Sequence, residues 1–193
     1  MKKILLLGDS IREGYCQLVK ADLEGRAEVV FPAENCRFTQ YTYHLLQTWT
    51  HDLLGREPDS ADNVAAIHWN CGHWDCERFS RIHEPLNSIP TYTEMIRRIE
   101  ESLEARYPKA RIIFATTTPM SPAHDGAGRT TEEIRAYNAA ALEALKGTRA
   151  EINDLFAILE NEPAETFRDY CHLTPEGCRK LADRVTAVVS EAL

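Results

Sequence analysis

The segment LLLGDSIRE, residues 5–13, joins a predicted buried strand to a predicted helix. Four apolar residues, Ile4 to Leu7, predict a short strand, and from Ile11 onward apolar residues recur at helical spacing. Between them lie a glycine, a carboxylate and a hydroxyl, and the question is what these three residues do at that junction.

A structural role explains them when they are taken alone. Ser10 followed by Glu13 matches a helix capping box, Gly8 suits a tight turn, and Asp9 lies near the positive end of the helix. A serine at a strand-to-helix turn also has its hydroxyl at the open edge of a sheet, where a nucleophile would lie. The rest of the chain must decide between these two interpretations.

Composition limits the classes of function. The 193 residues predict one domain over residues 1–193, with a core large enough to be stable without disulfide bonds or structural metals. A net charge of −8 without a basic run argues against nucleic-acid binding and against a polybasic membrane patch. No apolar stretch has transmembrane length, and the one after Lys2 and Lys3 is too short for a secretion signal. The six cysteines are expected to be thiols in a cytoplasmic protein, and the oligomeric state stays open.

Strand and helix patterns alternate along the chain. Strands are predicted at Lys3–Leu7, Glu28–Phe31, Asn63–Trp69, Arg111–Ala115 and Ala150–Asn153. This order predicts an α/β domain with a mainly parallel sheet covered on both faces. In such sheets the working site lies beyond the carboxyl ends of the strands. Five loops follow those ends: Gly8–Ser10, Pro32–Thr39, Asn70–Pro90, Thr116–Gly128 and Pro163–Leu173.

Those loops contain the residue types of a serine hydrolase. The last one includes RDYCHLTPEG, residues 168–177, in which His172 can act as general base for Ser10 and Asp169 can orient the imidazole. Asn70 can direct its amide at a developing oxyanion, a contact worth roughly 2.7–4 kcal/mol in a comparable hydrolase. Each residue has a structural explanation of its own, but their occurrence together at one predicted edge favours catalysis.

With these motifs the chain resembles the GDSL, or SGNH, hydrolase family of esterases and acylhydrolases. The resemblance extends from LLLGDS through HWNCGHWD (residues 68–75) and IIFATTTP (residues 112–119) to DYCHLTPEG. It implies a flavodoxin-like three-layer α/β/α sandwich with a five-stranded parallel sheet. It also implies that Ser10 is the nucleophile, Asp169 and His172 complete the triad, and Asn70 serves the oxyanion hole with the Ser10 N–H. The G-x-S-x-G elbow of α/β-hydrolases is missing around Ser10.

Two blocks depart from the family pattern. The second usually has a glycine whose backbone N–H joins the oxyanion hole, whereas PAENCRFTQY, residues 32–41, has none. Cys36 or Arg37 would occupy that place, and the sequence does not choose between them. The third block usually reads Gly-x-Asn-Asp, and here His68, Trp69 and Cys71 surround the asparagine.

Metal and nucleotide sites have weaker support. The cysteines and histidines of HWNCGHWDCERFSRIH, residues 68–83, match no standard zinc spacing: His68, Cys71, His73, Cys76 and His83. No G-x-G-x-x-G or P-loop spacing occurs. The sequence therefore predicts a mechanism that uses neither a metal nor another cofactor.

The resulting prediction is a serine esterase that acts through an acyl-enzyme on Ser10. Its expected substrate is a short-chain ester, acetyl in the simplest case, on a small molecule or a carbohydrate. His73 and Trp74 are expected to bind substrate, with Trp74 suited to stacking on a sugar ring. The alternatives are a lysophospholipase or thioesterase of the same family, or a non-catalytic ligand-binding module on the same fold.

Overall fold

The computed structural model describes residues 1–79 and 84–193. Its sheet has the strand order β2-β1-β3-β4-β5, and every neighbouring pair is parallel. The strands are β1 (Lys3–Leu7), β2 (Glu28–Val30), β3 (Val64–Trp69), β4 (Arg111–Ala115) and β5 (Glu151–Asn153). The five predicted strands are confirmed, with boundaries that differ by no more than one residue. All five carboxyl ends therefore lie along one edge of the sheet.

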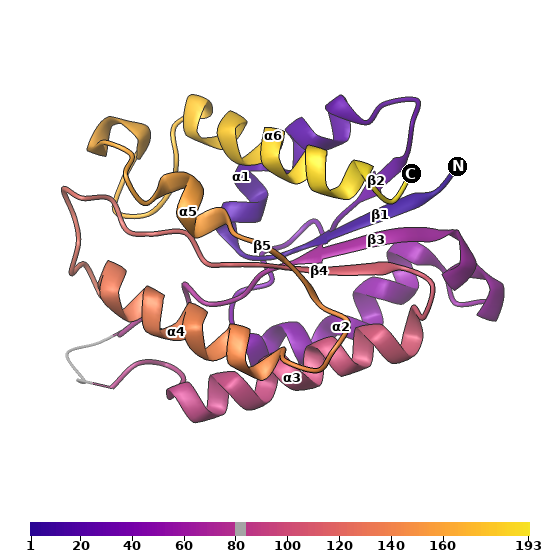
Figure 1. The fold of residues 1–193 in the computed structure, drawn as a ribbon, viewed down its shortest axis with the longest axis horizontal. Coiled ribbons are helices and arrows are strands. Elements are labelled where there is room, and N and C mark those ends of the chain that lie inside the picture. The colour runs from indigo at the N-terminus through magenta and orange to yellow at the C-terminus, as the bar shows by residue number, and fades with distance from the viewer. Residues whose placement is uncertain (80–83) are drawn as a thin grey trace.

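Helices cover both faces of this sheet, which gives the predicted three-layer arrangement (Figure 1). In Figure 1, α1, α5 and α6 lie on one face, and α2, α3 and α4 lie on the other. Their bounds are α1 (Ser10–Asp22), α2 (Thr39–Leu54), α3 (Ile89–Arg106), α4 (Thr131–Ala144), α5 (Leu155–Leu159) and α6 (Pro175–Ser190). Within the described residues, 3₁₀ turns lie at Pro58–Asn63 and Ala164–Thr166.

The alternation of side chains along β1 divides the core into two clusters. Leu5 and Leu7 pack with residues of α2, α3 and α4, whereas Ile4 and Leu6 pack with residues of α1 and α6. All four side chains are fully buried, and burying each contributes roughly 1.5–3 kcal/mol. This two-sided burial explains why an unbroken apolar run, rather than an alternating one, forms the central strand.

The start of α1 differs from the sequence prediction. Asp9, not Ser10, is the N-cap, because its Oδ1 accepts the Ile11 N–H at 3.0 Å. Ser10 is the first residue of the helix. The predicted capping box on Ser10 and Glu13 is therefore wrong, and the Ser10 hydroxyl is not needed to cap the helix.

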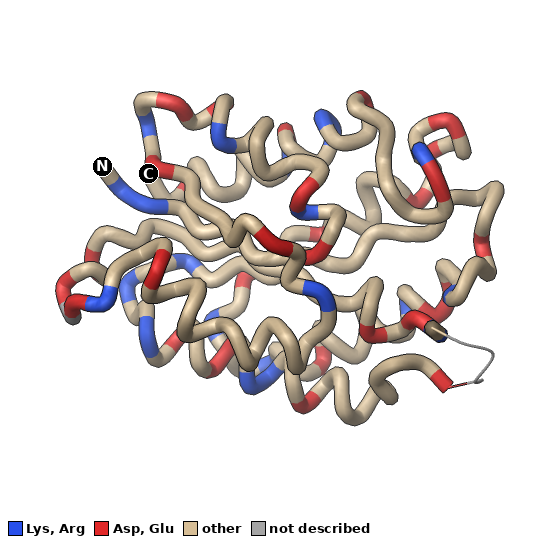
Figure 2. Tube along the Cα trace, turned by 180° about the vertical axis from the view of Figure 1, so that it is seen from behind, with Lys and Arg blue, Asp and Glu red and all other residues tan. Residues whose placement is uncertain are grey.

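Charges of both signs are interspersed over the molecule (Figure 2). Figure 2 shows short blue and red segments that alternate along the tube, without a long basic stretch in the part it describes. Among residues 1–79 and 84–193, no helix combines the length and apolar character needed to cross a membrane.

A buried carboxyl group lies beneath the sheet on α3. Glu100 accepts the Trp69 indole N–H on Oε2 at 3.0 Å, and its Oε1 has no hydrogen-bond partner within the described chain. Burial raises the pKa of Glu100 to about 7. Because this pKa is higher in the folded protein than in the unfolded chain, Glu100 favours folding at low pH, and that contribution is lost as the pH rises toward 7.

Glu100→Gln should therefore stabilise the protein increasingly at higher pH. The amide oxygen can still accept the Trp69 N–H, while the cost of ionising a buried carboxyl group disappears. We expect the gain in free energy of unfolding to grow by up to about 3 kcal/mol between pH 4.5 and about pH 8, as measured by urea denaturation. Parallel stability curves for variant and parent would contradict the raised pKa.

Candidate active site

Ser10, His172 and Asp169 form a continuous chain of hydrogen bonds at the carboxyl edge of the sheet. The His172 Nε2 lies 2.8 Å from the Ser10 Oγ, across a separation of 162 residues in sequence. The His172 Nδ1 lies 2.9 Å from both carboxylate oxygens of Asp169. Ser10 is held at the N-terminus of α1, and the other two residues lie in the segment between β5 and α6. The fold thus brings together the three residues that the sequence proposed as a triad.

The turn around Asp169 favours its ionised form. Its Oδ1 accepts the backbone N–H groups of Cys171 at 3.0 Å and His172 at 2.8 Å. Partial burial opposes ionisation, but these donors and the His172 ring outweigh it and hold the pKa of Asp169 below its usual value. An ionised Asp169 accepts a hydrogen bond from the Nδ1–H group, so the proton of the neutral imidazole stays on Nδ1 and the Nε2 lone pair faces the Ser10 hydroxyl.

Strand pairing places Asn70 beside the serine turn. Leu7 pairs with Trp69, and the Asn70 N–H donates to the Leu7 carbonyl at 3.2 Å. The Asn70 side chain is buried and lies directly on Gly8, where an added Cβ would be 2.0 Å from the Asn70 Oδ1. Gly8 is therefore required for the space that the Asn70 amide occupies.

The same turn contains the buried Asp9. Burial raises the pKa of Asp9, although the Asn70 side chain and the Ile11 N–H favour the ionised form. Asp9 caps α1 and borders Asn70, which makes it a support of the turn rather than a reacting group.

The structure corrects one of the two candidates for the missing glycine. The Cys36 N–H donates to the Gly8 carbonyl at 3.0 Å, inside the loop, so it is not available to a ligand. Arg37 has a φ of +55°, the left-handed conformation that glycine adopts most readily. Its N–H donates to the Asn35 Oδ1 at 2.8 Å, an exposed contact that a ligand can replace. Arg37 is thus the candidate that remains.

The loop after β2 is held by a buried arginine that the sequence analysis did not select. Arg12 lies on the inner face of α1 and donates to the carbonyls of Pro32 at 3.1 Å and Glu34 at 2.6 Å. Its Nε and Nη2 also approach the Gly8 carbonyl at 3.4 Å. The sequence signal that could have identified Arg12 was its position, a cation among the apolar residues of an amphipathic helix.

Asp75 is a second buried support that the sequence analysis missed. Its Oδ1 accepts the Thr39 N–H at 3.1 Å, the Thr39 hydroxyl at 2.7 Å and the Asn87 amide at 2.6 Å. Asp75 therefore caps α2, whose own N-cap residue, Phe38, has no side-chain hydrogen bond to the helix. Burial raises the pKa of Asp75 to about 6. This carboxylate joins the loop after β3 to the loop after β2.

The expected substrate contact by His73 is not supported. His73 is 2 % exposed, with Nε2 3.0 Å from the Thr118 hydroxyl and Nδ1 accepting from the Arg129 Nε at 3.0 Å. Both ring nitrogens are thus occupied by protein partners. Trp74 is half-buried and packs against Phe79, with ring centroids 5.5 Å apart, so its stacking on a sugar stays a prediction.

The cavity beside the serine has a lining that the sequence did not predict. It has a volume of about 330 Å³ and lies between α1 and the segment that leads into α6. Besides Ser10 and His172 it is lined by Ile11, Glu13, Gly14, Arg168, Leu173 and Cys178. The lining combines a small apolar surface with one acidic and one basic side chain.

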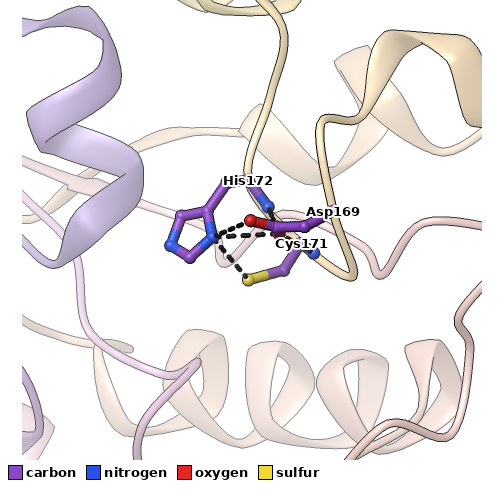
Figure 3. A group of neighbouring side chains, drawn as sticks. All are labelled: Asp169, Cys171 and His172. Atoms are coloured by element: carbon purple, nitrogen blue, oxygen red, sulfur yellow. Dashed lines mark hydrogen bonds and ion pairs between the residues drawn. The ribbon is translucent and has the colours of Figure 1, made fainter.

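One group of potential metal ligands lies within the described residues, and it overlaps the triad (Figure 3). Ligand atoms of Asp169, Cys171 and His172 lie within 4.8 Å of one another. Asp169 is already bonded to His172, Arg129 donates to the Cys171 Sγ at 3.4 Å, and burial raises the pKa of that thiol to about 12. A protonated thiol beside a guanidinium is a poor ligand set for a divalent cation. Of the Cys/His cluster weighed in the sequence, His83 lies outside the described residues.

Gly8→Ala should damage both stability and activity. The new methyl group would overlap the buried Asn70 amide, which must move; we expect a loss of about 1–3 kcal/mol in the free energy of unfolding. Because Asn70 packs on Gly8, two residues before Ser10, ester hydrolysis should also fall.

Gly25→Ala is the matched control for this substitution. Gly25 has a φ of +76° and no heavy atom within 4 Å of an added Cβ, so the substitution introduces backbone strain alone. It should destabilise the protein without lowering activity in the folded fraction. Denaturation curves and initial rates measure the two effects, and normal hydrolysis by Gly8→Ala would contradict the close packing of Asn70.

One family model matches most of the chain. Residues 6–180 match the model of the GDSL-like Lipase/Acylhydrolase family. No curated protein matches the sequence.

Several solved structures share the fold. An acetyl xylan esterase superposes with a TM-score of 0.76 at 17 % identity, covering 97 % of this chain and 99 % of its own. A lipase/acylhydrolase from Enterococcus faecalis gives 0.75 at 17 % identity, with 99 % and 96 % covered. The acetylxylan esterase Axe2 from Geobacillus stearothermophilus gives 0.75 at 16 % identity, with 97 % and 94 % covered. At these identities the likeness concerns the fold alone.

Proposed function

This chain belongs to the GDSL-like lipase/acylhydrolase family and is a carboxylic ester hydrolase, and we propose that it removes short acyl groups through a covalent intermediate on Ser10. The observation that carries the proposal is the unbroken hydrogen-bond chain from Ser10 through His172 to Asp169. A serine hydroxyl is weakly nucleophilic unless a base accepts its proton, and here the base lies at hydrogen-bond distance.

The proposed reaction has two halves. His172 Nε2 takes the Ser10 proton as Oγ bonds to the ester carbonyl carbon, and the carbonyl oxygen becomes an oxyanion. The imidazolium then gives its proton to the departing alcohol, which leaves an acyl-enzyme. Water repeats the sequence with His172 as base, releasing the carboxylic acid and restoring the Ser10 hydroxyl.

Three groups are proposed to stabilise the oxyanion. They are the Ser10 N–H at the start of α1, the Asn70 side-chain amide, and the Arg37 N–H after it exchanges Asn35 for the substrate oxygen. The N-terminus of α1 adds a favourable potential for negative charge at this point.

The cavity supports a short acyl group with a polar alcohol. Its apolar lining is confined to Ile11, Leu173 and Cys178, which offers little surface to a long alkyl chain. Glu13 and Arg168 add hydrogen-bonding capacity suited to hydroxyl-bearing substrates. The similar folds of two acetyl xylan esterases add support for an acetylated carbohydrate. All six cysteines are free thiols, which supports the proposal that the enzyme works in the cytoplasm.

Hydrolysis of p-nitrophenyl esters of increasing chain length tests the substrate class. We expect the highest kcat/KM for acetate or propionate, with a progressive decrease for longer chains, and no loss of activity after dialysis against a chelator. A preference for long chains would favour the lysophospholipase or thioesterase alternative, and activity that depends on added zinc would contradict the proposed mechanism.

A fluorophosphonate probe should label Ser10, and Ser10→Ala should abolish both labelling and turnover. Since Asp9 caps α1, loss of the hydroxyl should change the free energy of unfolding by only about 1 kcal/mol. Mass spectrometry of the adduct identifies the labelled residue. Ser88→Ala, which removes the capping hydroxyl of α3, is the control that should keep both properties; turnover by Ser10→Ala would remove Ser10 from the mechanism.

A further inference from the structure

We infer that Arg129 is a positioning residue that fastens the Asp169–His172 turn to the loop carrying Asn70, and so sets the distance between the base and the oxyanion site. The inference rests on the proposed serine mechanism. Arg129 lies immediately before the N-cap of α4, in the segment after β4, and its side chain is 2 % exposed. A buried guanidinium is costly unless its donors are satisfied, so its partners indicate its role.

Each nitrogen of the guanidinium contacts a different residue at the carboxyl edge of the sheet. Its Nε donates to the His73 Nδ1 at 3.0 Å, its Nη1 lies 2.5 Å from the Glu77 Oε2, and its Nη2 donates to the Cys171 Sγ at 3.4 Å. Its Cζ also lies over the Tyr170 ring, 5.6 Å from the centroid. These partners belong to the loop after β3 and to the turn before α6.

On one side, Arg129 packs against the triad turn, which is residues 169–172. Tyr170 and Cys171 are the two residues between Asp169 and His172, and both contact the guanidinium. The Ser121 N–H donates to the Tyr170 carbonyl at 2.8 Å, which ties the same turn to the same β4–α4 segment. Displacing Arg129 would free the backbone whose N–H groups hold the Asp169 carboxylate.

On the other side, Arg129 supports the loop that begins at Asn70. His73 accepts from Arg129 through Nδ1, so its proton is on Nε2 and is donated to the Thr118 hydroxyl. Burial first, and then the Arg129 charge, lower the pKa of His73 well below its usual value, which keeps the ring neutral and this arrangement fixed. The Thr117 hydroxyl donates to the Cys71 carbonyl at 3.0 Å, one residue after Asn70.

Arg129 thus joins the two segments that must act on one carbonyl group. Each of its three nitrogens contacts a protein atom, and we assign it no part in the proton transfers themselves. Its effect comes through geometry, because a misplacement of about 1 Å between base and substrate can cost about 100-fold in rate.

The test compares Arg129→Lys and Arg129→Met with Arg135→Met. Arg135 is a fair control because it also pairs with a glutamate, Glu160, and covers an aromatic ring, Phe156, but lies on α4. On p-nitrophenyl acetate we expect both Arg129 variants to lower kcat by about tenfold or more with KM changed less than about threefold, and the control to match the parent.

A second readout does not need turnover. The His172 Nδ1–H that bonds to Asp169 should give a downfield proton resonance, assigned by its loss in His172→Ala. We expect it to broaden or shift in the folded Arg129 variants and to stay in place in Arg135→Met. If the unsubstituted protein shows this resonance but hydrolyses no ester, the proposed function is rejected, and the resonance in the Arg129 variants still tests the positioning role.

Cys171→Ala keeps the inference falsifiable if the Arg129 variants do not fold. It removes one partner without leaving a buried charge unpaired, since Glu77 stays beside Arg129. We expect kcat to fall about three- to tenfold and the resonance to shift, with recovery in Cys171→Ser, which restores an acceptor. Unchanged kcat and an unchanged resonance in Cys171→Ala would overturn the positioning role.

Discussion

The parallel pairing of β1 with β3 is the constraint on which the rest of the site depends. It sets Leu7 opposite Trp69, so the first residues beyond both strands emerge side by side. Gly8 has no side chain to separate them, and the Asn70 amide fills the space above it. A shift of this register by one residue would send every β1 side chain to the wrong core cluster, so the hydrophobic core itself protects the alignment of Ser10 with Asn70.

Buried polar groups then fix the loops around that point. Arg12 holds the segment after β2 against α1, Asp75 holds it against the loop after β3, and Arg129 connects that loop with the triad turn. Desolvating these charges works against stability, and their hydrogen bonds offset much of that cost. Hydrophobic residues at these positions could fill the same space. Because apolar contacts are not directional, they would not fix the orientation of each backbone segment.

The sequence predicted the fold well because its strongest signals are local. Unbroken apolar runs such as Ile4 to Leu7 predict buried strands, and the alternation with helices leaves few topologies. It also selected Ser10, Asn70, Asp169 and His172, since topology collects residues that follow strand ends at one edge.

The sequence predictions failed where tertiary contacts or exact backbone angles decide the outcome. His73 was expected to bind substrate, and only the position of Arg129, 56 residues away, shows that its ring is enclosed. Arg129 itself lies one residue beyond the predicted loop at Thr116–Gly128. Ser10 looked like a helix cap because both Asp9 and Ser10 have the chemistry for it, and backbone angles decide between them.

Arg37 adopts the left-handed backbone conformation, which explains how the loop after β2 can form without a glycine. A non-glycine residue in that conformation costs roughly 1–2 kcal/mol. Asn35 offsets part of this cost by accepting the Arg37 N–H, and the guanidinium lies 4.6 Å from the centre of the Tyr41 ring, a contact worth about 0.5–1 kcal/mol at an exposed site. Tyr41 is itself held by its hydroxyl bond to Glu34. The side chains of the loop thus stabilise the backbone angle that glycine would supply without strain. In the proposed oxyanion hole, this N–H is already oriented, and the Asn35 amide it would give up is exposed, so water can take its place. Exchanging Asn35 for an oxyanion would therefore require little reorganisation of the loop.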